Sequence, residues 1–526
     1  MEKFFNTAGP MQADQHYCVP PLERINKVEL VQLIDARKYF VLHAPRQTGK
    51  TSCLLALTAE LNANRQYRAV YANVEAAQAA RERVDAAMRA IMSEISGRAR
   101  YFLKDDFPET LRKKILSDSS GEDALGRMLM EWSEADARPL ILMLDEVDAL
   151  IGDTLISLLR QLRGGYDKRP GSFPQSIILC GVRDVRDYRI HSSATKEIIT
   201  GGSAFNIKAE SLRLGNFSLA EITQLYRQHT EATGQVFEDD IFPLVWEWTA
   251  GQPWLVNALA HQATSNIREM RDRTKPVTIA VMQQAKEELI LRRDTHLDQL
   301  TDKLSEPRVR RVIQPLLSGE DELHNVAEAD ISYVRDLGLI SQSKPVAIAN
   351  GIYREIIPRE LTYGTQEYMV QETEWYVAPD GRIDMNKLLA AFQQFFREHS
   401  ESWVERFEYK EAGPQLLLQA FLQRVINGGG RIEREYGLGR KRTDLLLVWP
   451  YPQGVQRAVI ELKLGSQQNE KIIEQGLRQT MDYMDKCGAG EGHLVLFDRN
   501  PQRTWDEKIF QRAATHAAHT IQLWGM

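Results

Sequence analysis

The amino-acid sequence predicts an α/β protein whose first half is a doubly wound parallel sheet. Short, mainly apolar runs occur at 38–44, 68–74, 139–147 and 175–182, and helical patterns separate them. Strands of this kind are buried on both faces, which is typical of a parallel sheet covered by helices on both sides. A loop that contains glycine and lysine joins the first strand to a helix expected over 51–62. Together these observations predict a sheet of the doubly wound type.

Length and composition indicate a multidomain protein of the cytoplasm. The 526 residues exceed what one hydrophobic core usually holds, and 43% hydrophobic with 26% charged residues is ordinary for soluble proteins. The net charge of −6 excludes a general attraction to nucleic acid, so such contact would need a local basic patch. The four cysteines share no metal-ligand spacing, no secretory signal begins the chain, and no apolar run approaches the roughly 20 residues that span a membrane.

The segment APRQTGKTS at 44–52 lies between the first strand and the helix. This is the context of a P-loop, where backbone N–H groups and a helix N-terminus bind phosphate oxygens. We expect Lys50 to reach the β- and γ-phosphates of ATP and Thr51 to bind Mg²⁺. Ala44 replaces the usual first glycine, which is tolerable if its φ is not positive. The residues expected to contact the nucleotide here are Pro45, Arg46, Gln47, Thr48, Gly49, Lys50, Thr51 and Ser52. A chance glycine–lysine turn is the alternative.

The apolar strand LILMLDEVD at 140–148 ends in acidic residues. We expect Asp145 to hold Mg²⁺, directly or through a water, and Glu146 to polarise the water that attacks ATP. Asp148 is expected to be structural. The alternative is a domain that binds nucleotide but hydrolyses it very slowly.

Arginines near two further elements are candidates for the same site. Arg183 follows the next apolar strand, so it can sense the γ-phosphate, or it is a surface residue paired with Asp184 or Asp187. Arg160 and Arg163 lie on the helix after the acidic strand. They can act as arginine fingers between subunits of a homo-oligomer, although a solvated helix face explains them more simply.

The middle of the chain changes to helical patterns. Ser218 and Glu221 form a capping box that opens an amphipathic helix. Short helices follow, and then 345–357 has the pattern of a strand pair, which suggests a winged-helix unit. The domains we predict are a nucleotide-binding domain at 1–210, a helical lid at 211–293, a winged-helix-like unit at 294–364, a linker at 365–382 and a compact α/β domain at 383–526.

The last domain contains a candidate metal site. Asp444 begins an apolar strand, and Glu461 and Lys463 lie on the next strand, where residues two apart share a face. Two carboxylates suit Mg²⁺, which can polarise a phosphodiester and activate a water, while Lys463 can orient that water or stabilise developing charge.

Two resemblances follow from these motifs. APRQTGKT, LDEVD, Arg183 and the GQP at 251–253 resemble the signal-transducing (STAND) clade of AAA+ ATPases. That resemblance implies that Pro253 packs against the adenine ring and that a winged helix follows the helical subdomain.

The C-terminal pattern resembles the PD-(D/E)xK nucleases, in which Asp444, Glu461 and Lys463 would be catalytic and Asp444 and Glu461 would bind metal. Related members carry a Q-x-x-x-Y on the following helix, which matches Gln479 and Tyr483. The family often has a glutamate on its first helix. That helix has Gln415 and Gln419 instead, so Glu411 is the best substitute ligand. The alternatives are an ordinary Glu–Lys pair with an unrelated aspartate, and a degenerate fold that binds DNA without cutting it.

Basic residues support a nucleic-acid path near Asp444. They are Arg431, Arg434, Arg440, Lys441 and Arg442. Phosphate contacts are independent of base sequence. A solvated basic hairpin is the alternative.

The function predicted from the sequence is an ATP-regulated, Mg²⁺-dependent (or Mn²⁺-dependent) nuclease that cuts DNA. Anti-phage defence is a setting suggested by analogy alone. The rival function is an ATP-dependent switch or scaffold whose last domain binds DNA or a protein. A DNA motor ranks below both, because the sequence has no separate translocation motif.

Overall fold

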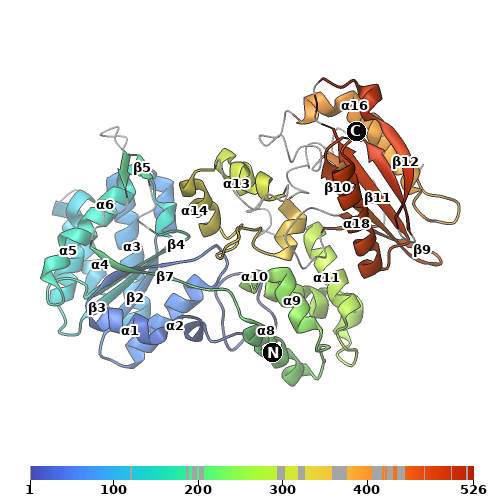
Figure 1. Cartoon of the computed structure of the whole chain (residues 1–526). Coiled ribbons are helices and arrows are strands. Elements are labelled where there is room, and N and C mark those ends of the chain that lie inside the picture. The colour runs from blue at the N-terminus through green and yellow to red at the C-terminus, as the bar shows by residue number, and fades with distance from the viewer. Residues whose placement is uncertain are drawn as a thin grey trace. The chain divides into compact units, whose positions relative to one another are not determined.

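The computed structural model (Figure 1) describes most of the chain as two compact units. The first unit comprises Met1–Arg292 with Asp336–Gly338, and the second comprises Arg293–Arg335 with Leu339–Met526. The residues described are 2–118, 121–184, 189–191, 198–200, 207–292, 302–317, 326–357, 376–404, 417–419, 421–422, 430–434, 445–466, 468–498, 500, 502–516 and 519–526.

The first unit is built on a five-stranded sheet in the order β2-β3-β4-β1-β7, and every pair of neighbours is parallel. The strands are β1 (Tyr39–His43), β2 (Arg68–Asn73), β3 (Leu140–Asp145), β4 (Ser176–Gly181) and β7 (Lys208–Arg213). The predicted parallel α/β sheet is therefore confirmed, with four strands at the expected places. The polar edge strand β7 was not predicted.

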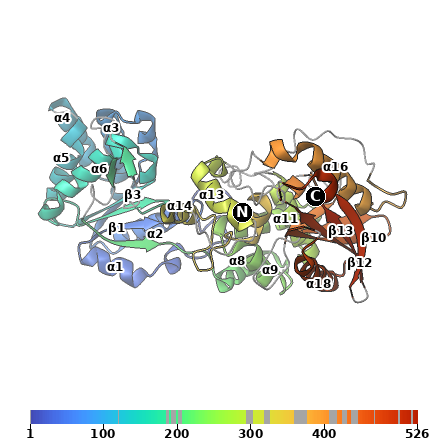
Figure 2. The same ribbon diagram turned by 45° about the horizontal axis from the view of Figure 1, so that its top comes forward.

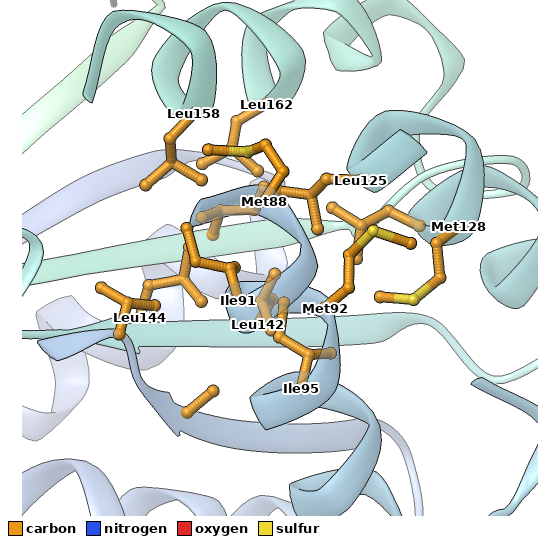
Figure 3. Packing of buried hydrophobic residues seen from close by; sticks show 14 of the residues in the cluster. Met88, Ile91, Met92, Ile95, Leu125, Met128, Leu142, Leu144, Leu158 and Leu162 are labelled. Atoms are coloured by element: carbon orange, nitrogen blue, oxygen red, sulfur yellow. The ribbon is translucent and has the colours of Figure 1, made fainter. Parts of the chain in front are cut away.

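Side chains of these strands alternate between two apolar cores. Tyr39 and Val41 of β1 join one core, while Phe40 and Leu42 join the other. The layer that includes α3, α5 and α6 covers the first face, and α1 and α2 cover the second (Figure 2). Figure 3 shows how side chains of α3, α5 and α6 interdigitate over the sheet. The helices are α1 (Lys27–Asp35), α2 (Lys50–Ala63), α3 (Val84–Leu103), α4 (Phe107–Asp118), α5 (Gly121–Glu134) and α6 (Gly152–Gly164).

A group of helices follows β7. They are α8 (Leu219–Thr233), α9 (Ile241–Thr249), α10 (Pro253–His261) and α11 (Ile279–Arg292). The predicted capping box of Ser218 and Glu221 opens α8. Gly251 has φ 72°, and a Cβ there would lie 1.8 Å from the carbonyl oxygen of Phe217, so only glycine fits this close approach.

The region before the last domain corrects one prediction. It contains α13 (Pro307–Leu317) and α14 (Glu328–Asp336). The expected strand pair over 345–357 is wrong in its second half, because 351–357 is helical, and β pairing in the described part is an isolated bridge between Ile340 and Ile348. The Asn350 side chain accepts a hydrogen bond from the Tyr353 backbone N–H at 2.8 Å, which caps this helix and outweighs the strand propensity of its isoleucines.

The second unit carries a six-stranded mixed sheet in the order β12-β13-β11-β10-β9-β8. The strands are β8 (Arg431–Arg434), β9 (Leu445–Tyr451), β10 (Gly454–Leu464), β11 (Glu491–Phe497), β12 (Phe510–His516) and β13 (His519–Gly525). β8, β9 and β10 are antiparallel, and β11 is parallel to β10. α16 (Met385–Val404) and α18 (Glu470–Cys487) supply residues to the cores on opposite faces.

Among the described residues, the structure contains no helix long and apolar enough to cross a membrane. None of the four cysteines forms a disulfide, and Cys53 and Cys180 are buried in the apolar core.

Candidate functional site

The loop between β1 and α2 has the backbone of a phosphate-binding turn. Gly49 has φ 96° directly before the first residue of α2, and Gln47 also lies in the left-handed region with φ 57°. Ala44 does not have a positive φ, so its methyl group is accommodated as expected. The N-terminus of α2 consequently directs its backbone N–H groups toward the space above the loop.

Lys50 is the first residue of α2, and its side chain is buried. Its Nζ donates hydrogen bonds to the carbonyl oxygens of Ala44 (3.0 Å) and Pro45 (3.1 Å). The ammonium group is thus held against the loop, at the place where phosphate oxygens would compete for it.

Thr51 and Asp145 converge from two elements. The Thr51 Oγ1 donates to Asp145 Oδ2 at 2.7 Å, and the Tyr71 hydroxyl donates to the same oxygen at 3.1 Å. Asp145 is fully buried at the end of β3. Oxygen donors this close together fit a hard divalent cation such as Mg²⁺. Burial and the neighbouring Asp145 raise the pKa of Tyr71, so its hydroxyl remains a donor.

Glu146 extends from the strand end next to Asp145. Its backbone lies in the left-handed region with φ 57° and ψ 39°, and its N–H donates to Asp145 Oδ1 at 3.0 Å. Burial raises the pKa of Glu146, while the charge of Lys50 lowers it and Asp148 raises it further. A carboxylate whose pKa is raised is a stronger base, so it is better suited to accept a proton from water. Asp148 accepts a hydrogen bond from the Val182 N–H at 3.4 Å, consistent with the expected structural role.

Arg24 supports the phosphate loop and was not identified from the sequence. Its guanidinium donates to the carbonyl oxygens of Thr48 (2.6 Å) and Gly215 (2.7 Å). A Cβ on Gly49 would lie 2.7 Å from Arg24 Nη1. Burial lowers the pKa of Arg24 to about 10, so the group stays charged at neutral pH. No local pattern marks this residue, because it contacts a loop more than 20 positions away.

Arg183 follows β4 and meets an acidic partner that the sequence did not predict. Its Nε lies 3.8 Å from Asp336 Oδ2, and Arg213 Nη1 of β7 lies 3.3 Å from Asp336 Oδ1. β4 and β7 both flank β1, so two cations and one buried carboxylate lie at the sheet edge that carries the phosphate loop. Asp187, one of the expected alternatives, lies outside the described residues.

The other residues predicted to contact the nucleotide or a neighbouring subunit lie on α10 and α6. Pro253 is the buried first residue of α10, and the Gln252 side chain caps that helix by accepting from the Leu255 N–H at 2.6 Å. Arg160 and Arg163 are exposed on α6.

Glu461 and Lys463 lie side by side on β10, as alternation along a strand requires. Both are fully buried, and Lys463 Nζ donates to Glu461 Oε1 in an ion pair. Their neighbours Ile460 and Leu462 enter the core that contains α16, whereas Val459 enters the core that contains α18. The pair therefore faces α18, where Tyr483 is buried and Gln479 is half-buried.

Several predicted residues lie outside the described part of the chain. They are Asp444, Glu411, Gln415, Arg440, Lys441 and Arg442. The described strand β9 begins at Leu445, which pairs with Ile460 beside Glu461. Within the described residues, there is no group of three or more His, Cys, Asp or Glu side chains arranged to hold a metal.

Comparison with known proteins gives a family for the first two-thirds of the chain. A model described as the AAA-like domain matches residues 21–356, more than half of the sequence. A search of curated proteins finds no match.

Three solved structures of low sequence identity are among those similar to this chain. A Walker-type ATPase of Pyrococcus abyssi is 15% identical and has a TM-score of 0.48, over 67% of this chain and 99% of its own. Cdc6p from Pyrobaculum aerophilum is 15% identical with a TM-score of 0.36, over 69% of this chain and 96% of its own. RuvB of Thermotoga maritima, a Holliday junction branch migration motor, is 12% identical with a TM-score of 0.32, over 66% and 97%.

Proposed function

Because the chain belongs to the AAA-like domain family and carries a Walker-type ATPase module, we propose that ATP turnover in this module controls a metal-dependent nuclease in the last domain. The observation that carries the ATPase half is the convergence of Lys50, Thr51, Asp145 and Glu146 at one edge of a parallel sheet.

In this proposal, each residue of the ATPase module has a separate role in ATP hydrolysis. Lys50 and the N-terminus of α2 bind the phosphates, and Thr51 and Asp145 would hold Mg²⁺. The chemistry that the bound cation supplies is neutralisation of phosphate charge. Glu146 orients a water and accepts its proton as the water oxygen bonds to the γ-phosphorus and the bond to ADP breaks. Pro253 packs against the base, and Arg183 senses the γ-phosphate.

For the last domain, we infer phosphodiester hydrolysis of the PD-(D/E)xK type. The supporting observation is the buried Glu461–Lys463 pair, within an order of helix, three antiparallel strands, helix and a parallel strand. Glu461 with Asp444, and with Glu411 as a further ligand, would bind Mg²⁺ or Mn²⁺. Lys463 would stabilise the charge that develops on the phosphate.

Other parts of this proposal concern partners and setting. DNA would approach through the basic segment that contains Arg431 and Arg434. Arg160 or Arg163 would act between subunits of a homo-oligomer. The setting is cytoplasmic, and a role in defence against phage is inferred from the combination of modules alone.

One observation favours the rival function, a switch or scaffold that does not cut. Glu461 and Lys463 neutralise each other in the core, and a nuclease needs carboxylates that reach a metal and a substrate. In that case the last domain would bind DNA or a protein under the control of ATP.

Cleavage assays distinguish the two functions. Plasmid and linear DNA would be incubated with Mg²⁺ or Mn²⁺, with and without ATP, using wild type, Glu461→Gln and Lys50→Ala. The proposal expects Glu461→Gln, which is nearly isosteric, to lose cutting but to keep ATPase activity, and it expects Lys50→Ala to uncouple cutting from ATP. Exposed Glu470 of α18 provides the matched control, Glu470→Gln, which should cut like wild type.

The outcomes lead to separate conclusions. Cutting that survives Glu461→Gln would refute the proposed nuclease site. Cutting that ignores both ATP and Lys50→Ala would refute the coupling. If wild type cuts neither DNA nor RNA but binds DNA, the scaffold function is the correct one.

A further inference from the structure

The carboxylate of Asp145 at the end of β3 is held by neutral hydrogen-bond donors. Its Oδ2 accepts from Thr51 Oγ1 at 2.7 Å and from the Tyr71 hydroxyl at 3.1 Å, and its Oδ1 accepts from the Glu146 N–H at 3.0 Å. Asp145 is fully buried, and a carboxylate removed from water needs such donors or a cation to remain ionised. Because these donors are neutral, the negative charge stays available to a cation.

Tyr71 lies on β2, the edge strand that pairs with β3 in the first sheet. It is 3% exposed and belongs, with Met143, to the core that α1 and α2 cover. Met143 and Asp145 are two residues apart on β3, so their side chains share this face of the sheet. Thr51 approaches from α2, which packs on the same core. The Oδ2 atom of Asp145 is therefore held from two elements, the neighbouring strand and the helix that covers it.

The need of a buried tyrosine for a hydrogen-bond partner does not by itself explain this contact. A buried tyrosine hydroxyl usually finds an acceptor, and two others in the first unit use backbone carbonyl oxygens. Tyr39 donates to the Pro174 carbonyl at 3.1 Å, and Tyr226 donates to the Val256 carbonyl at 2.8 Å. Tyr71 instead donates to a carboxylate of the nucleotide site, so its hydroxyl acts on a group that the proposed mechanism uses.

Tyr71 also differs from Thr51 in what its hydroxyl group has to do. Thr51 is assigned to the cation, so its oxygen would serve the cation and the carboxylate together. No such role is assigned to Tyr71, so it can hold Asp145 Oδ2 whether or not a cation is bound. The Arg98 guanidinium carbon lies 5.6 Å from the centroid of the Tyr71 ring, which helps to fix the ring in place.

We propose that Tyr71 is a positioning residue of the ATPase site: its hydroxyl fixes the orientation of the Asp145 carboxylate and so raises the affinity for the Mg²⁺ that binds with the nucleotide. This role rests on the proposed ATP and Mg²⁺ binding and deepens it, because Tyr71 acts on the cation only through Asp145. Partners that orient metal-binding side chains typically contribute about 10- to 100-fold to metal affinity.

The test is how strongly Mg²⁺ tightens the binding of ADP, which has no γ-phosphate to hydrolyse. Calorimetry would measure ADP binding to the full chain in EDTA and in saturating Mg²⁺, for wild type and Tyr71→Phe. The phenylalanine keeps the ring and removes only the hydroxyl, so the core should stay packed. We expect Tyr71→Phe to bind ADP like wild type in EDTA and to lose about tenfold of the tightening by Mg²⁺.

Tyr67→Phe is the matched control. The hydroxyl of Tyr67, a buried residue just before β2, also donates to an aspartate, Asp35. This bond lies at the amino-terminal end of the parallel strands, whereas Asp145 lies at their carboxyl-terminal end. Tyr67→Phe removes the same kind of bond away from the nucleotide site, so it should bind ADP like wild type in both conditions.

The Mg²⁺ dependence of ATP turnover gives a second measurement. Tyr71→Phe should need about tenfold more Mg²⁺ for half-maximal turnover, because its Asp145 carboxylate is less well oriented. Its rate should approach that of wild type when Mg²⁺ is saturating. A residue that only supports the fold would lower the rate at every Mg²⁺ concentration.

The role of Tyr71 is overturned if Tyr71→Phe shows the wild-type effect of Mg²⁺, if it loses ADP affinity equally with and without Mg²⁺, or if it does not fold. It is also overturned if Tyr67→Phe changes the Mg²⁺ effect to the same extent. A separate failure concerns the nucleotide site itself. If ADP binding is unaffected by Mg²⁺ in wild type and is unaffected by Lys50→Ala, the proposed ATP site is refuted.

Discussion

The phosphate loop after β1 and the Glu461–Lys463 pair on β10 hold their charged groups in different ways. At the loop, Lys50 is bonded to carbonyl oxygens and Asp145 to hydroxyl groups, so neither charge is paired with an opposite one by those bonds. On β10, two opposite charges are buried against each other. The comparison shows that Lys50 can bind an anionic ligand without first breaking an ion pair. At the second site, the ion pair between Glu461 and Lys463 must break before Glu461 can bind a cation.

Replacing Lys50 should produce the largest effect. Lys50→Ala removes the cation that the loop carbonyls hold in place, and we expect ATP turnover to fall at least about 1000-fold. A phosphate-release assay would measure this, and circular dichroism would verify that the variant is folded. If turnover stayed within tenfold of wild type, Lys50 would not be the group that binds the phosphates of ATP, and this contrast with the Glu461–Lys463 pair would be wrong.

Glu146→Gln should separate binding from hydrolysis. The amide cannot accept a proton, so we expect turnover to fall about 100-fold while ATP affinity stays within a few-fold of wild type. Parallel turnover and calorimetric measurements would test this. Asp148→Asn serves as control, because that residue is expected to be structural. Normal turnover by Glu146→Gln would remove Glu146 from its assigned role.

Substitutions in the buried Glu461–Lys463 pair should change the free energy of unfolding. Lys463→Met leaves the Glu461 carboxylate without its cation, and we expect the free energy of unfolding to fall by ~3–5 kcal/mol. Adding Glu461→Leu should restore most of that loss, because an apolar pair of similar volume has no charge to desolvate. Urea denaturation of the two variants and wild type would measure both effects. Additive losses would show that the two charges do not stabilise each other.

A substitution of Asp336 tests whether its negative charge weakens ATP binding by pairing with Arg183 and Arg213. Asp336→Asn weakens the attraction to Arg183 and Arg213, which lie beside the phosphate loop. We expect ATP to bind about fivefold more tightly, a change of ~1 kcal/mol, because the carboxylate that competes with the phosphates for the two arginines loses its charge. Calorimetry at low salt would detect the change, and Asp330→Asn on α14 is the control. Unchanged affinity would argue that Asp336 is only a structural partner of the two arginines.

The pH dependence of turnover should be the smallest effect. Burial raises the pKa of Glu146, and its carboxylate must be deprotonated to accept a proton from water. Turnover should therefore be lost as the pH falls through this raised pKa, at a higher pH than an ordinary glutamate would give. A pH–rate profile of wild type, compared with the residual rate of Glu146→Gln, would test this. The same inflection in the variant would assign it to another group.

The sequence predicted those features that depend on local patterns. Four strands of the first sheet, the helix after the loop and the Ser218 capping box are determined by apolar periodicity and by residues within one turn of each other. The contacts of Arg24, Tyr71 and Asp336 join distant segments, so spacing alone does not identify them. β7 is a polar edge strand, and its sequence lacks the apolar run that marked its neighbours. The isoleucines at 351–357 suggested a strand, but this segment is a helix, because Asn350 caps its N-terminus and its apolar residues have helical spacing.

The left-handed backbone conformation of Glu146 implies that stability and catalytic activity make opposite demands at this position. A glutamate with φ 57° is strained by about 1–2 kcal/mol relative to glycine, which adopts this conformation freely. Replacement by glycine would therefore make the protein harder to unfold while removing the carboxylate that we assign to water activation. Selection for thermal resistance alone would favour a molecule that retains its fold and its nucleotide but is catalytically silent.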